Sequence, residues 1–196
     1  MKNGIIVVLA VVVFGLSGWV VYDKTSDSES TPAGSNTSTS SGNSESTQVS
    51  SGKTLDLSNQ GLTEVGPNIY GQTDTVVLML SNNKLKSLKS EMGKMTKLEV
   101  LKLDHNLLEG SLIGEIRKMP LKTLDASYNK MTGIPAEIGQ LDQLETLDFS
   151  YNNIDSYPNE IANLKQLKTL NLTGNPFSAK KIAELKSKLP NTNIVF

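Results

Sequence analysis

The chain has 196 residues, with 19 lysines and arginines against 20 aspartates and glutamates, and a formal net charge of −1. This balance provides no strongly basic surface, so we expect no nucleic-acid partner. There is no cysteine and a single histidine, His105. Disulfides and thiolate metal sites are therefore excluded, and little material remains for a metal centre. The sequence predicts neither a metal nor a cofactor.

The beginning of the chain predicts a membrane anchor. Residues 4–22 carry no charge and are mostly Ile, Val, Leu and Phe, and about 20 such residues span a bilayer as a helix. Lys2 precedes this segment, so the positive-inside rule places residues 1–3 in the cytoplasm and the rest of the chain outside the cell membrane. The alternative is a cleaved signal peptide, which would make the protein secreted.

A polar segment follows the apolar one. Residues 23–52 are rich in Ser, Thr, Gly and Asn, and Val49 is their only strongly apolar residue. Such a composition cannot bury enough apolar surface to offset the entropy lost on ordering. We therefore predict a disordered linker, which would hold the next domain on the order of 30 Å from the membrane.

The remaining residues, 53–196, contain a pattern that recurs every 23 residues. The most regular copy runs from Leu144 to Ile154 and reads L-x-x-L-x-L-x-x-N-x-L, with phenylalanine at the sixth position. Other copies, the first two weaker, lie around Leu55, Leu78, Leu101, Leu124 and Leu170. A constant period in the twenties is the sequence signature of a solenoid.

Each repeat divides into a strand and a return segment. The x-L-x-L part predicts a strand whose leucines point inward and whose intervening residues point outward, so that successive strands form one parallel sheet. An asparagine follows each strand at Asn83, Asn106, Asn129, Asn152 and Asn175. A buried amide can bond the backbone groups of a turn, so we interpret these asparagines as structural. The return segment, as in Met131 to Leu141, has the apolar spacing of a short helical turn.

Two places depart from this regularity. After Leu108 the apolar positions fall one or two residues late, which predicts a local bulge on the back of the coil near Gly110 to Gly114. At the carboxyl end, Ser178 can cap a helix over residues 179–188. Ile194 can then continue the strand column after one extra residue, giving the terminal unit that a solenoid needs for solubility.

The repeated L-x-x-L-x-L-x-x-N-x-L, followed by I-P-x-E-I-G-x-L from Ile134, resembles the leucine-rich repeat family. The period is similar to its typical class, the Ile134 segment resembles Ras-group and Scribble-like repeats, and residues 108–116 resemble the plant type. The resemblance implies an α/β solenoid, a right-handed superhelix of about six repeats with a concave parallel β-sheet and a C-terminal helix-strand cap. It also implies binding, usually to protein, on the concave sheet, and no common catalytic residues. The absence of cysteine-bearing end caps fits a membrane-anchored bacterial member.

The outward positions of the strands provide a candidate binding surface, where acidic and aromatic side chains meet. Its candidate ligand-binding residues are Lys102, Asp104, His105, Asp125, Tyr128, Asp148 and Tyr151. Paired aromatic residues beside acids suit a basic or polar partner. The alternative interpretation is that these residues only keep an exposed sheet soluble.

No enzymatic role is predicted. Asp125 and Asp148 would lie about 5 Å apart on adjacent strands, but an open wall lacks the enclosed pocket that tunes acid–base groups. A triad of His105, Asp104 and Ser127 is disfavoured because neighbouring strand residues point to opposite faces. We therefore expect a non-catalytic module, tethered outside the membrane, that binds a protein or surface polymer. The alternatives are a secreted binding protein and a surface scaffold without a specific ligand.

Overall fold

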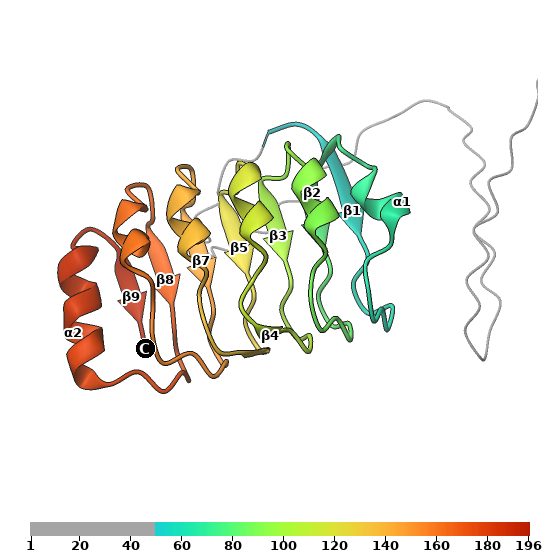
Figure 1. Cartoon of the computed structure of the whole chain (residues 1–196). Helices are drawn as coiled ribbons and strands as arrows, with labels where there is room; N and C mark the ends of the chain where they lie inside the picture. Colours follow the sequence, from blue (N-terminus) through green and yellow to red (C-terminus); the bar gives the residue numbers. More distant parts are fainter. Residues whose placement is uncertain (1–49) are drawn as a thin grey trace, which may run out of the picture. The chain divides into compact units, whose positions relative to one another are not determined.

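The computed structural model describes residues 50–196. The predicted anchor at residues 4–22 and nearly all of the predicted linker lie outside the described residues. The described part contains a seven-stranded parallel sheet (Figure 1). Its strands pair in chain order: β1 (Lys53–Asp56), β2 (Thr75–Met79), β3 (Val100–Lys102), β5 (Thr123–Asp125), β7 (Thr146–Asp148), β8 (Thr169–Asn171) and β9 (Asn193–Val195).

The register of this sheet confirms the predicted repeat phase. Leu101 pairs with Leu124, and Leu124 with Leu147, so each step across the sheet advances the chain by one repeat. These leucines point into the core and are fully buried. At the last step Leu170 pairs with Ile194, which accommodates the one extra residue expected from the sequence.

The return segments form short helices in a second layer beside the strands (Figure 1). They are α1 (Pro67–Tyr70) and four 3-10 helices, η1 (Ser90–Lys94), η2 (Gly114–Lys118), η3 (Ala136–Gln140) and η4 (Asn159–Asn163). Each 3-10 helix buries one apolar side chain in the core, as Ile138 does. A Cβ at Gly139 would lie 2.2 Å from the carbonyl oxygen of Glu160, so a side chain there would force η3 and η4 apart.

The irregular repeat after Leu108 forms a second, two-stranded sheet. β4 (Glu109–Gly110) pairs in parallel with β6 (Lys130–Met131). Gly110 adopts a left-handed φ of 68°, and its carbonyl accepts hydrogen bonds from the amides of Thr132 and Gly133. The repeat whose apolar positions fall late therefore forms an additional strand pair with the next repeat. The sequence predicted a bulge at this place.

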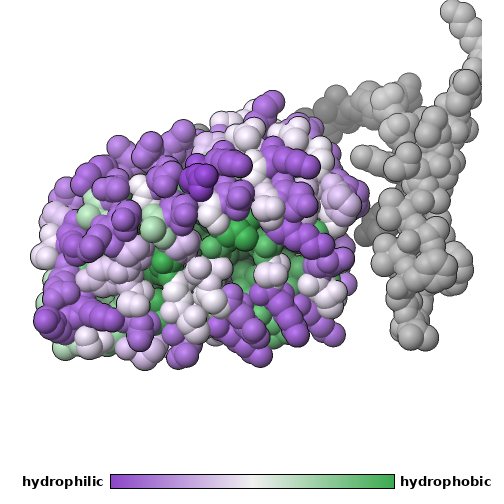
Figure 2. All heavy atoms as spheres, viewed as in Figure 1, coloured by the Kyte–Doolittle hydropathy of each residue, from purple (hydrophilic) through white to green (hydrophobic). Residues whose placement is uncertain are grey.

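The carboxyl end is closed by the predicted cap. α2 (Ala179–Lys188) begins after Ser178, whose hydroxyl oxygen accepts from the amide of Lys181. Leu185 is fully buried against the core. Polar side chains cover most of the face shown in Figure 2, with apolar groups visible mainly in hollows between them. Within the part of the chain that the structure describes, no helix has the length and apolar character needed to cross a bilayer.

Candidate functional site

The turn after each strand is closed by the predicted asparagine. The Nδ2 group of Asn106 donates to the carbonyls of Leu80 and Leu103 at 2.9 and 3.0 Å, and its Oδ1 accepts from the amide of Leu85 at 3.0 Å. Asn129 and Asn152 make the equivalent bonds one and two repeats later. These bonds confirm the structural interpretation, because they satisfy backbone groups that the turn would otherwise leave unpaired.

The residue immediately before each of these asparagines, and before Gln60 at the same position of the first repeat, adopts a left-handed backbone conformation. The φ values are 60° at Asn59, 56° at Asn82, 54° at His105, 51° at Tyr128, 53° at Tyr151 and 75° at Gly174. Asparagine and glycine often occupy this region, whereas other residues pay roughly 1–2 kcal/mol for it. The two tyrosines therefore occupy a backbone position that does not favour them.

At this position three rings form a continuous stack, which we call the aromatic row (His105, Tyr128 and Tyr151). The centroids of His105 and Tyr128 lie 4.4 Å apart, and those of Tyr128 and Tyr151 also lie 4.4 Å apart, with interplanar angles of 13° and 19°. A Cβ added at Gly174 would lie 2.8 Å from Cδ1 of Tyr151. The last ring therefore lies over the glycine of the next repeat.

The predicted acidic residues close the strand ends. Oδ1 of Asp125 accepts from the amide and hydroxyl of Ser127, and its Oδ2 lies 3.1 Å from Nζ of Lys102. Asp148 repeats this arrangement, with Ser150 bonded to one oxygen and Asn171 donating to the other at 2.9 Å. Both carboxylates therefore have internal partners.

The remaining acid, Asp104, lies beside the aromatic row. Its carboxylate accepts a hydrogen bond from the hydroxyl of Ser81, and its Oδ2 lies 3.0 Å from Nδ1 of His105. Partial burial raises the pKa of the Asp104 carboxyl, but the bonds from Ser81 and His105 outweigh this effect and hold the pKa below its ordinary value.

One sequence-based expectation about this surface was wrong. Asp104 and His105 do not point to opposite faces, because His105 lies beyond the strand in a left-handed turn, where strand alternation no longer applies. Ser127 and Ser150 are buried, with 6% and 3% of their surface exposed, and their hydroxyls donate to Asp125 and Asp148. The Ser127 hydroxyl bonds to Asp125 and not to His105, so these residues do not form a catalytic triad.

The structure thus divides the seven predicted site residues between the strands and the turns that follow them. Tyr128 and Tyr151 are 45% and 48% exposed, whereas Lys102, Asp125 and Asp148 are bonded within the sheet. Gly174 belongs to this surface and was missed as a site residue. The variation of its column among Asn, His, Tyr and Gly was the available signal. Among residues 50–196, no three potential metal ligands gather into a site.

Residues 120–177 match the family model described as leucine rich repeat. The fold is a leucine-rich repeat solenoid. The seven-stranded parallel sheet and the short helices of the return segments agree with this assignment.

Among solved structures, a leucine-rich repeat protein of Leptospira interrogans is similar to the chain, with 24% identity and a TM-score of 0.42. That match covers 69% of this chain and 52% of the Leptospira protein, so the chain spans about half the length of that protein. No curated protein matches the chain significantly.

Proposed function

We propose that this leucine-rich repeat protein is a non-catalytic module that binds another protein through the outward face of its sheet and the aromatic row in the adjoining turns. The row is the observation that carries the proposal. Within residues 50–196, the exposed large apolar side chains are Tyr128, Tyr151 and Val195, so two of the three lie in one stack. Exposed tyrosines near the centre of a surface are frequent binding hot spots.

The cost of placing these tyrosines supports the same proposal. The equivalent positions in earlier repeats hold Asn59 and Asn82, residues that adopt the left-handed conformation readily. The tyrosines gain mutual stacking, worth about 0.5–1.5 kcal/mol per pair, which roughly offsets the backbone strain. Since the fold gains little from them, we infer that these rings serve an external contact.

The geometry of the row favours a protein over a surface polymer. Both faces of the Tyr128 ring are covered, by His105 on one side and Tyr151 on the other. A sugar would need such a face for stacking. The ring edges and hydroxyl groups remain available, and they suit the mixed polar and apolar contacts of a protein surface. Because Asp125 and Asp148 are bonded internally, a strongly basic partner is not required.

We further propose that the module is anchored outside the cell membrane by residues 4–22, as a bacterial-type member of this repeat class. The apolar composition of residues 4–22, the polar linker at 23–52 and the absence of cysteine support this location. Secretion after signal cleavage is the alternative. The full-length protein should be recovered in washed membranes, whereas recovery of a shortened form from the medium would establish secretion.

The binding proposal can be tested by covalent capture in the source cells. A tagged full-length chain would be crosslinked and its partners identified by mass spectrometry, alongside the double variant Tyr128→Ser/Tyr151→Ser. The matched control, Lys94→Ser/Lys97→Ser, changes two exposed residues at the η1 layer. We expect the aromatic variant to capture at least tenfold less of a partner protein that the control captures in an unchanged amount. Equal capture by both variants would instead favour a scaffold without a ligand on the sheet.

A further inference from the structure

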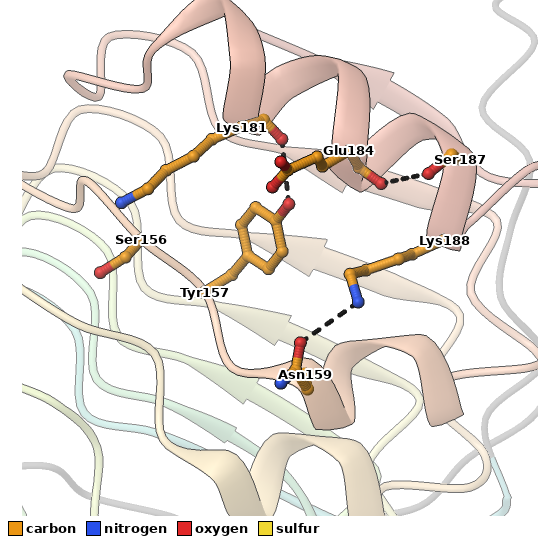
Figure 3. Close-up of a pocket in the computed structure, with 7 residues that line it drawn as sticks. All are labelled: Ser156, Tyr157, Asn159, Lys181, Glu184, Ser187 and Lys188. Carbon is orange, nitrogen blue, oxygen red and sulfur yellow. Dashed lines mark hydrogen bonds between the residues drawn. The ribbon is translucent and has the colours of Figure 1, made fainter.

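A groove lies between η4 and α2, at the carboxyl end of the solenoid (Figure 3). It has a volume of about 400 Å³ and is lined by the seven residues labelled in Figure 3. It contains no residue of the aromatic row, so any ligand bound there is independent of the proposed protein-binding face. This groove was not predicted from the sequence, because it forms where α2 packs against the last complete repeat.

One wall of the groove is held in place by Tyr157. Its hydroxyl donates to the carbonyl of Lys181 at 3.0 Å. Its ring lies 6.2 Å from that of Phe177, which in turn meets the ring of Phe196 edge-on at 6.0 Å. Tyr157 therefore connects the segment before η4 to α2, and its ring lines the groove beside the polar groups.

Two lysines of the groove have only neutral partners. Nζ of Lys181 donates to the carbonyl of Asp155 at 2.8 Å, and Nζ of Lys188 donates to Oδ1 of Asn159 at 3.2 Å. Within the described residues, neither ammonium group has a carboxylate within ion-pair distance. Two ammonium groups and one carboxylate, that of Glu184, therefore line this groove, and the carboxylate is not within ion-pair distance of either ammonium group.

The other two lysines of α2 are placed differently. Lys180 lies 4.0 Å from the carboxylate of Glu184, and Lys186 lies 5.8 Å above the ring of Phe196. Neither lines the groove. The four lysines thus form two pairs of equal charge on one helix, and only Lys181 and Lys188 face the groove, a difference that an experiment can exploit.

We propose that this groove binds the phosphate group of a small ligand. Ammonium groups bind phosphate as compact point charges. The Nδ2 group of Asn159 can add a neutral donor, because Oδ1 of that side chain is the atom that accepts from Lys188. Tyr157 would contact the organic part of the ligand. Glu184 also lines the groove, so its negative charge opposes a polyanion and restricts the ligand to a single phosphate group.

Binding should be measured on the full-length chain at constant ionic strength, in a buffer without phosphate and a detergent that has no charge and no phosphate group. Inorganic phosphate and glycerol 3-phosphate would be titrated and followed by ³¹P NMR line broadening, with glycerol as the uncharged control ligand in calorimetry. We expect millimolar or tighter binding of both phosphates and none of glycerol. Competition of phosphatidylglycerol or phosphatidylcholine, each in mixed detergent micelles, with bound glycerol 3-phosphate then shows whether the natural source is a lipid headgroup or a soluble phosphate ester.

The decisive comparison is between the two lysine pairs. Lys181→Gln/Lys188→Gln should weaken phosphate binding at least tenfold, whereas Lys180→Gln/Lys186→Gln, with the same change in net charge on the same helix, should weaken it less than twofold. Equal weakening by both pairs, or no binding by the unmodified chain, would overturn the proposal. If the first double variant unfolds, Asn159→Ala provides the second test, since it removes the acceptor of Lys188 and the neutral donor. It should weaken binding at least threefold, and unchanged binding would also overturn the proposal.

Discussion

Two consecutive positions of the repeat differ in how far their side chains vary from one repeat to the next. We call the residues at one such position a column. One is the asparagine column, whose members are Asn83, Asn106, Asn129, Asn152 and Asn175. The other, one residue earlier, holds Asn82, His105, Tyr128, Tyr151 and Gly174. All members of the second column share a left-handed backbone, but their side chains range from an amide through aromatic rings to the hydrogen atom of glycine.

The difference follows from what each side chain bonds. An asparagine amide such as Asn106 joins the backbone of two adjacent turns, and among other side chains only the longer glutamine carries the same neutral donor and acceptor. The side chain of Tyr128 contacts mainly the two rings beside it. The fold therefore dictates the first column and sets only the backbone of the second. A function placed in the second column does not disturb the turn.

The largest effect is expected in the first column. Asn106→Ala removes the bonds to Leu80, Leu103 and Leu85 at a site where only 6% of the asparagine surface is exposed. The free energy of unfolding should fall by about 3 kcal/mol or more, because buried backbone groups lose their partners. Urea denaturation at constant protein concentration measures this. The neighbouring variant His105→Asn is the control, and a loss at Asn106 no larger than the control's would contradict the comparison.

An intermediate effect is expected at Gly174, where the second column lacks a side chain. Gly174→Ala adds left-handed strain and a Cβ that would lie 2.8 Å from Cδ1 of Tyr151, so the unfolding free energy should fall by about 2 kcal/mol. Gly61→Ala is a matched control, since Gly61 also has a left-handed φ, of 67°, but has open space around its Cβ position. It should lose only about 1 kcal/mol. Thermal unfolding of both variants gives the difference, and the ring signals of Tyr151 should shift only in the first.

How far the sequence predicts this molecule depends on the same distinction. The sheet, its register and the asparagine bonds follow from periodic spacing, because each repeat must bury the same leucines. α2 was predicted from its capping residue, Ser178. The contact between Asp104 and His105 was not predicted, because His105 was placed on a strand. The asparagines and the glycine at the same position of other repeats were the signal for a left-handed turn. The groove at Lys181 could not be predicted either, because it depends on how α2 packs against η4, and packing of non-equivalent elements has no period.

A smaller effect is expected within the second column. Tyr128→Asn removes two ring contacts but relieves left-handed strain, two contributions of similar size and opposite sign. The free energy of unfolding should therefore change by less than about 1 kcal/mol, while capture of the partner falls sharply. Paired urea titrations and crosslinking on the same preparation separate these quantities. A loss of stability comparable with that of Asn106→Ala would show that the row is part of the structural framework.

The smallest effect concerns Asp104, where the second column meets a charged group. Its folded pKa is lowered by the bonds from Ser81 and His105, which outweigh the effect of partial burial. The stabilisation is therefore present above the unfolded pKa of about 3.9 and is lost as the pH falls through the lower folded value. Unfolding free energies of the unmodified chain and of Asp104→Asn should differ at pH 6 and converge below about pH 4. A difference that stays constant between pH 6 and pH 3 would mean that the carboxylate charge does not contribute, and that Asp104 acts only as a neutral acceptor for Ser81.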